Sequence, residues 1–223
     1  MKIVAILGSP HGLKGATGTL LAEVVRGAQD AGAEATVLSL TEHKVNPCVA
    51  CDACHKTGRC PQKDDFNVLQ SALMEADGIL LASPNYIVSV SAQMKAVFDR
   101  CCGPLHCQAM RDKYAAAVET SGGVGGQEVQ QYMLRFLRTL GCWTVGSVGA
   151  TGMDLADPSR RQRAFAAAAE LGQALVQAIR QKQTFPEQRP ERQAFFERMR
   201  SLVQFRKDAW PYEYQHWTSK GWL

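Results

Sequence analysis

The stretch KIVAILGSP (residues 2–10) decides the fold of this chain. Its first part, KIVAILG, is a β-branched run with apolar side chains on both faces, which is the pattern of a buried parallel strand. A loop that contains glycine and threonine follows, and a helix is predicted over 17–31, where Gly32 closes it. A strand that leads through such a loop into a helix begins a βαβ unit, so an α/β fold is expected.

Four more strands continue the alternation of strand and helix. They are predicted over 34–40, 78–84, 113–123 and 142–150, with helices over 64–75, 92–101, 127–140 and 159–181. Strands that alternate with helices form a parallel sheet, and right-handed crossovers put helices on both of its faces. We therefore expect a five-stranded parallel sheet inside a three-layer α/β sandwich that spans residues 1–183.

Residues 184–223 form a predicted C-terminal extension with a different composition. It contains a charged amphipathic helix over 187–203 and an aromatic-rich tail over 208–223. Such a tail packs either on its own domain or on a second subunit. We expect the second arrangement, in which the extension serves oligomerisation.

The bulk composition excludes several classes of protein. Hydrophobic residues make up 46% and charged residues 21% of the chain, as in an ordinary globular domain. The net charge of +4 comes without a stacked-aromatic motif, so no nucleic-acid partner is expected. The first apolar run is too short for a signal peptide, and no run is long enough to cross a membrane. We expect a cytoplasmic protein, in which the 8 cysteines serve metal or redox chemistry rather than disulfides.

Four of these cysteines are spaced C-x2-C-x2-C-x5-C within a loop predicted over 45–63. They are Cys48, Cys51, Cys54 and Cys60. Two residues between thiolates allow a tight turn to point both sulfurs at one centre, and three such sulfurs in series suit a cubane iron–sulfur cluster. The alternatives are a zinc site, two disulfides or reduced thiols. Zinc sites usually take ligands from two separated knuckles, and disulfides are rare in reducing compartments, so the cluster is favoured.

The loop GSPHGLKGAT (residues 8–17) joins the first strand to its helix and predicts a phosphate site. Backbone N–H groups and the helix dipole hold phosphates at such turns. The loop has neither the G-K-[ST] ending of a P-loop nor a G-x-G-x-x-G motif, which argues against a nucleoside triphosphate or a Rossmann dinucleotide. Ser9 and Thr17 add hydroxyls and His11 adds partial positive charge, so a ligand with a single phosphate is expected. A purely structural turn is the alternative.

Two further loops leave the same predicted edge of the sheet. SPNYIVSVSAQMK (residues 83–95) carries a proline and a tyrosine that would form a partly apolar wall, and TSGGVGGQE (residues 120–128) has glycines that let the main chain approach a flat ligand. Ligands of open α/β sheets bind outside the carboxyl ends of the strands. Three such loops at one edge predict a ligand site, although each alone is compatible with an ordinary turn.

The segments GSPHG…ATGTLL, SPNYIVSVSAQMK and GGVGGQE resemble the flavin-binding loops of the flavodoxin-like NAD(P)H-dependent FMN reductase superfamily. With the four-cysteine spacing, the chain is most similar to the iron–sulfur flavoprotein branch of that superfamily. The resemblance covers roughly residues 1–180. It implies bound FMN, a [4Fe-4S] cluster, the flavodoxin-like strand order 2-1-3-4-5, and a homodimer or homotetramer.

The resemblance also implies three sets of ligand residues, which are carried over by position. The residues that would line the phosphate are Ser9, His11, Ala16, Thr17 and Gly18. Those that would surround the ring system are Pro84, Asn85, Tyr86, Ile87, Thr120, Gly122, Gly123 and Gly126. Cys48, Cys51, Cys54 and Cys60 would bind iron.

The expected function is electron transfer between a two-electron donor and one-electron carriers through FMN and the cluster. NAD(P)H is considered as the donor, a redox partner protein or small molecule is the other reactant, and no catalytic side chain is expected to be essential. One alternative is an NAD(P)H-dependent FMN or quinone oxidoreductase in which the cysteine loop is structural. Another is a flavodoxin-fold module that holds zinc in this loop and binds a partner through its tail.

The remaining cysteines and the charges of the loop are interpreted conservatively. Cys142 begins a strand and is expected in the core. Cys101, Cys102 and Cys107 lie near His106; a second metal or redox site there is considered, but partial exposure is favoured. Four cations flank the loop thiols, and solvated charge is favoured over a role beside the cluster. They are His55, Lys56, Arg59 and Lys63.

Overall fold

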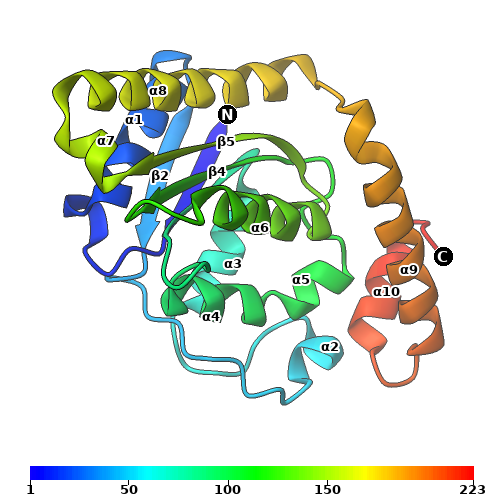
Figure 1. Cartoon of the computed structure of the whole chain (residues 1–223). Coiled ribbons are helices and arrows are strands. Elements are labelled where there is room, and N and C mark those ends of the chain that lie inside the picture. The colour runs from blue at the N-terminus through cyan, green and yellow to red at the C-terminus, as the bar shows by residue number, and fades with distance from the viewer.

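Five parallel strands form one twisted sheet at the centre of the molecule (Figure 1). The computed structural model describes all residues, 1–223. The strands are β1 (Lys2–Leu7), β2 (Glu34–Ser39), β3 (Gly78–Pro84), β4 (Tyr114–Ser121) and β5 (Trp143–Thr151). Their order is β2-β1-β3-β4-β5, and every neighbouring pair is parallel. The expected flavodoxin-like sheet is therefore confirmed.

Helices cover both faces of this sheet. One face carries α1 (Ala16–Asp30) and α8 (Pro158–Gln181), and the other carries α3 (Phe66–Glu75), α4 (Ala92–Arg100) and α6 (Gly126–Thr139). These helices match the sequence prediction to within about two residues at each end. Three helices of five residues each, all missed by the prediction, are α2 (Ala53–Thr57), α5 (Cys102–His106) and α7 (Gly152–Ala156). No helix combines the length and the apolar character that a membrane span would need.

The two faces of the sheet have separate hydrophobic cores because side chains alternate along each strand. Along β1, Ile3 and Leu7 pack toward α1 and α8, whereas Val4 and Ile6 pack toward α3, α4 and α6. All of these side chains are buried. The interior of β1 is thereby wholly apolar, and the loop that follows it carries the polar side chains at the carboxyl edge of the sheet.

The C-terminal extension consists of α9 (Arg189–Phe205) and α10 (Pro211–Ser219). Gln188, just before α9, bonds the backbone of Thr144 on the edge strand β5 through both its amide oxygen and its amide nitrogen, at 3.0 and 2.8 Å. The indole of Trp217 on α10 is fully buried against α9, and its N–H donates to the carbonyl of His106 at 2.8 Å. Figure 1 shows both helices beside α5 and α2.

The aromatic tail thus packs on its own chain, which is the arrangement that the sequence analysis did not favour. The physical reason is that Trp217 and Trp222 close a small core with Phe196 on α9. A division of the chain at residue 183 and a role of the extension in oligomerisation stay predictions.

Candidate functional site

The loop between β1 and α1 lies at the carboxyl edge of the sheet. The helix begins at Ala16, so its first amides, at Ala16, Thr17 and Gly18, have no carbonyl one turn earlier to bond. Ser9 is buried and its Oγ accepts from the backbone N–H of His11 at 3.3 Å. These free amides and the positive end of the helix dipole can hold a phosphate, while the His11 side chain is exposed beside them.

This loop is joined to the exit of β4 by a pair of hydroxyls. Thr17 Oγ1 and Thr120 Oγ1 are 2.6 Å apart, and both residues are buried. Gly18 allows the close packing behind them, since a Cβ at this position would lie 2.5 Å from the carbonyl oxygen of Gly12. The start of α1 is therefore fixed to the strand that carries the third loop.

The second and third loops are bonded to each other as well. The backbone N–H of Asn85 donates to the carbonyl of Thr120 at 2.8 Å, and its side-chain amide donates to the carbonyl of Val124 at 2.8 Å. A two-residue turn follows between Tyr86 and Ser89, whose backbones bond each other in both directions at 2.8 and 3.1 Å. The three predicted loops are thus one connected edge of the protein.

The turn in the second loop holds two β-branched residues in a strained backbone conformation. Ile87 and Val88 have φ of 52° and 55°, in the left-handed region that β-branched residues rarely adopt. Their side chains are 96% and 59% exposed, and Val124 opposite them is 83% exposed. Strain of this kind costs roughly 1–3 kcal/mol per residue and is concentrated at binding sites. An exposed apolar rim that is held under strain is what a flat aromatic ligand would cover.

An open depression of about 320 Å³ lies within this rim. Asn85, Ile87, Val88 and Val124 line it together with Gly122 and Gly123. A Cβ on either glycine would meet no atom within 4 Å, so their missing side chains leave the space free. The Asn85–Thr120 and Thr17–Thr120 hydrogen bonds connect this depression to the phosphate loop. The free amides at the start of α1 suit a phosphate and the depression suits a ring, so the two together suit a ligand that has both.

The predicted flavin residues therefore lie on three hydrogen-bonded loops, except for Gly126, which belongs to a helix. Gly126 is the first residue of α6, and a Cβ there would come within 2.6 Å of Oε2 of Glu119 beneath the helix. A side chain at position 126 would clash with this carboxyl group, so packing explains why the residue is glycine. Whether the other positions bind a ring stays a prediction at this point.

Glu119 is a buried carboxyl group that the sequence analysis missed. It is 1% exposed on strand β4, directly after a run of small apolar residues, and its Oε1 has no hydrogen-bond partner. Burial raises the pKa of this carboxyl, and hydrogen bonds from Gln130 and Ser121 offset the rise only in part. The signal was present in the sequence, because a glutamate interrupts the run of small apolar residues in YAAAVETS.

The four cysteines of the loop line one cavity of about 150 Å³. Cys48 and Cys51 are exposed, Cys54 and Cys60 are half-buried, and none of the four forms a disulfide. Burial raises the pKa of the Cys54 thiol to about 11, and the neighbouring Cys102 adds to the rise. The thiolate form that binds metal is thus disfavoured there until a cation compensates for it. The chemistry of this donor set fits an iron–sulfur cluster.

A buried ion pair closes the base of the cysteine loop. Arg100, the last residue of α4, donates to both carboxylate oxygens of Asp64 at 2.7 and 3.0 Å and to the carbonyl of Asn46 at 2.9 Å. The Asp64 carboxylate also accepts from the backbone N–H of Asn46 at 2.8 Å. The hydrogen bonds from Arg100 and the loop backbone outweigh burial and lower the pKa of Asp64. The residues on either side of the four cysteines are thereby held together.

The same arginine supplies charge to the cysteine cavity. Arg100 lines the cavity, and its pKa is raised by Asp64 and by the nearby Cys60 although burial opposes the rise. Among the cations considered in the sequence, Lys56 and Arg59 are exposed, as expected for solvated loop charge, whereas His55 is buried and bonded to Glu213 at 2.6 Å. Sequence alone could not identify Arg100, since its partner lies 36 positions away.

A model of the family described as NADPH-dependent FMN reductase matches residues 1–154. The chain belongs to this family. An iron–sulfur flavoprotein of Archaeoglobus fulgidus is 30% identical over 224 residues, which cover 100% of both chains. A second, from Methanocaldococcus jannaschii, is 38% identical over 141 residues, or 61% of this chain and 72% of that protein. The chain therefore falls among the iron–sulfur flavoproteins of the FMN reductase family.

A solved flavone reductase has a similar fold, with a TM-score of 0.66 at 18% identity, covering 81% of this chain and 63% of that one. At this identity the likeness concerns the fold alone. Membership of the FMN reductase family makes the chain a flavin-dependent oxidoreductase, with FMN as the flavin that the family name gives. The three connected loops are the part of the structure that can receive it.

The buried carboxyl of this FMN reductase family member should give its stability a measurable pH dependence. A carboxyl whose pKa is raised by folding contributes stability that is fully present below its unfolded pKa and is lost as the pH rises through the folded pKa. Glu119→Gln removes the charged form. We expect the melting temperature of this variant to exceed that of the native protein by a few degrees at about pH 8, with the gain shrinking toward about pH 4. Equal gains at both pH values in calorimetry would contradict the assignment.

Proposed function

We propose that this protein is an iron–sulfur flavoprotein that transfers electrons between a two-electron donor and one-electron carriers. The observation that carries the proposal is the single cavity lined by Cys48, Cys51, Cys54 and Cys60, in a chain of the FMN reductase family. When bound, FMN exchanges two electrons with a hydride donor and releases them singly, whereas a [4Fe-4S] cluster carries one electron at a time.

The FMN would bind at the three connected loops. The amides at Ala16, Thr17 and Gly18 would hold the phosphate at the start of α1. The strained turn at Ile87 would cover one side of the ring, and the depression at Gly122 would receive it. The residues act by binding and orienting the flavin and by shielding it from water.

The iron–sulfur cluster would bind in the cysteine loop. With four thiolate ligands the cluster would carry a net negative charge, which increases on reduction. The guanidinium of Arg100 in the cavity wall would therefore stabilise the reduced form. Two relatives named iron–sulfur flavoproteins support this assignment. The residues of the loop act by ligation, and the Arg100–Asp64 pair acts by holding the loop closed.

Helix α4 connects the two proposed sites. Its N-cap, Ser91, lies two residues after the turn at Tyr86–Ser89, and its last residue, Arg100, lines the cysteine cavity. The helix has 9 residues, which at the standard rise is about 13 Å.

We propose NADH or NADPH as the electron donor and a redox partner protein or small molecule as the other reactant. We also propose that the protein assembles as a homodimer or homotetramer, which sedimentation of the purified protein measures.

The cluster is tested by counting iron, sulfide and FMN per chain after anaerobic purification. We expect about four iron and four sulfide per chain beside FMN. Cys51→Ser should lose most of the iron and sulfide and keep its FMN, because Cys51 is exposed and its removal leaves the core intact. Cys142→Ala, which removes a buried thiol just before β5 and outside the cysteine cavity, should keep both.

Three outcomes would reject the cluster proposal. Full iron content in Cys51→Ser would exclude this residue as a ligand. FMN without iron in the native protein, with rapid reduction of the flavin by NADPH, would favour an FMN or quinone reductase with a structural loop. Zinc without flavin would favour a binding module.

The flavin depression is tested with a substitution that fills it. Gly122→Val adds a branched side chain where the protein has free space, so the fold should tolerate it while the ring is displaced. We expect FMN to bind at least about tenfold more weakly, which corresponds to about 1.4 kcal/mol. Ala174→Val, on the exposed face of α8, is the matched control and should bind FMN normally. Unchanged affinity in fluorescence titrations of Gly122→Val would place the ring elsewhere.

A further inference from the structure

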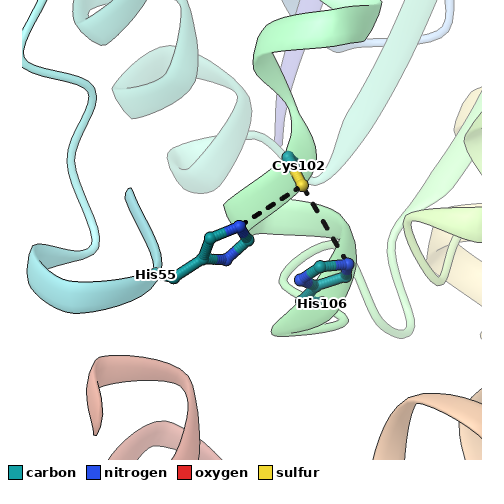
Figure 2. Close-up of side chains that lie close together, drawn as sticks. All are labelled: His55, Cys102 and His106. Atoms are coloured by element: carbon teal, nitrogen blue, oxygen red, sulfur yellow. Dashed lines mark hydrogen bonds between the residues drawn. The ribbon is translucent and has the colours of Figure 1, made fainter. Parts of the chain in front are cut away.

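A second group of metal-binding side chains lies beside the cysteine cavity (Figure 2). His55 comes from α2, and Cys102 and His106 come from α5. The Nε2 atoms of both histidines lie 4.0 Å from Cys102 Sγ, and each residue has a ligand atom within 4.8 Å of the others. Figure 2 shows the two imidazole rings directed at the one sulfur from different elements.

Glu213 on α10 orients both imidazole rings from behind. Its carboxylate is fully buried and bonds Nδ1 of His55 at 2.6 Å and Nδ1 of His106 at 3.2 Å. A carboxylate on Nδ1 fixes the tautomer that leaves Nε2 free as a ligand, which is the usual outer-shell arrangement around metal-bound histidine. Two histidines held in this way by one glutamate are difficult to explain by packing alone.

The group is enclosed on its other side by aromatic side chains. The ring of Trp210 stacks on His55 at 4.4 Å and on His106 at 4.7 Å between centroids. Trp217 donates to the carbonyl of His106 at 2.8 Å. The two rings therefore cannot turn freely, and their Nε2 atoms are oriented before any ion arrives.

We propose that His55 Nε2, His106 Nε2 and Cys102 Sγ bind one zinc ion, with water in the fourth position. Zinc bonds of about 2.0–2.1 Å to nitrogen and 2.3 Å to sulfur in a tetrahedron separate nitrogen from sulfur by roughly 3.6 Å and nitrogen from nitrogen by roughly 3.3 Å. Each Nε2–Sγ distance of 4.0 Å would therefore shorten by about 0.4 Å on zinc binding. The ligand nitrogens of the two histidines, which lie within 4.8 Å of each other, would move closer together as well. Zinc accepts this mixture of imidazole and thiolate ligands, whereas calcium and magnesium require oxygen ligands.

The zinc site is distinct from the four-cysteine site, although the two are adjacent. Cys102 lies in the wall of the cysteine cavity and contributes to the pKa of Cys54, so one thiol borders both sites. The four cysteines of the loop are not gathered at the spacing of a single ion, whereas His55, Cys102 and His106 are. A cubane holds its thiolates further apart than one ion does, so each group of ligands matches a different centre.

The ion would act as a structural clamp. It would join α2, which carries Cys54, to α5, and through Glu213 it would tie both helices to α10. Helix α2 has only 5 residues, too few to be stable without tertiary contacts. A zinc ion at this point would therefore fix the middle of the cysteine loop, whose two ends the Arg100–Asp64 pair holds together.

The test measures zinc in the anaerobically purified holoprotein and its coordination by X-ray absorption at the zinc edge, where iron does not contribute. We expect one zinc per chain with one sulfur at about 2.3 Å and three nitrogen or oxygen atoms at about 2.0 Å. Cys102→Ser and His106→Asn should lose the zinc while FMN is retained. Cys101→Ala removes the neighbouring buried thiol and should keep the zinc.

Glu213→Gln is the milder variant that separates positioning from folding. It keeps the shape of the side chain but reverses part of its hydrogen bonding, so zinc affinity against a competing chelator should fall about 10–100-fold while circular dichroism stays unchanged. Protein without zinc, or zinc surrounded by four sulfurs, would overturn the proposal. Full zinc content in Cys102→Ser or unchanged affinity in Glu213→Gln would do the same. These results are independent of the iron and FMN counts, so the electron-transfer proposal can stand or fail separately.

Discussion

The buried ion pair between Arg100 and Asp64 is the constraint on which the cysteine site depends. The segment from the end of β2 to the start of α3 is mostly exposed, and His55 is its one buried residue between positions 41 and 65. The bidentate bond at 2.7 and 3.0 Å, together with the bond from Arg100 to the Asn46 carbonyl, fixes both ends of this loop at one point. Breaking one partner of such a pair typically costs 3–5 kcal/mol, because the other charge is left buried. The pair therefore helps to keep the four thiols around one cavity.

Helix α4 transmits this constraint to the flavin side. Ser91 caps its first turn by accepting from the N–H of Met94 at 3.2 Å, and the same hydroxyl donates to the carbonyl of Gly8 at 2.6 Å. One end of the helix is thus fixed to the phosphate loop and the other to the cysteine loop. A helix of nine residues between two loops keeps their separation constant, which the proposed electron transfer between FMN and the cluster would need.

The sequence was sufficient for the parts of the structure that depend on local pattern. The sheet order followed from the resemblance, and the strand positions followed from apolar runs such as that of β1, because a strand buried on both faces has few alternatives. The cysteine loop and the three edge loops were found because spacing and glycine content are local features. The sequence was insufficient where function depends on distant pairs. The Arg100–Asp64 pair joins residues that are 36 positions apart, and the His55–Glu213 pair joins residues that are 158 positions apart. Contacts over such separations leave no periodic pattern in the sequence.

The C-terminal helices pack against α2 and α5, the two short helices beside the cysteine cavity. A tail with several aromatic residues suggests a partner, but such a tail can also cover a surface of its own domain. Here Trp210 stacks on His55 of α2 and His106 of α5, while the carboxylate of Glu213 bonds Nδ1 of both rings. A fully buried carboxylate is costly to place unless it is hydrogen-bonded. Its bonds to the two imidazoles therefore make the last helix a fixed element of the fold around these residues.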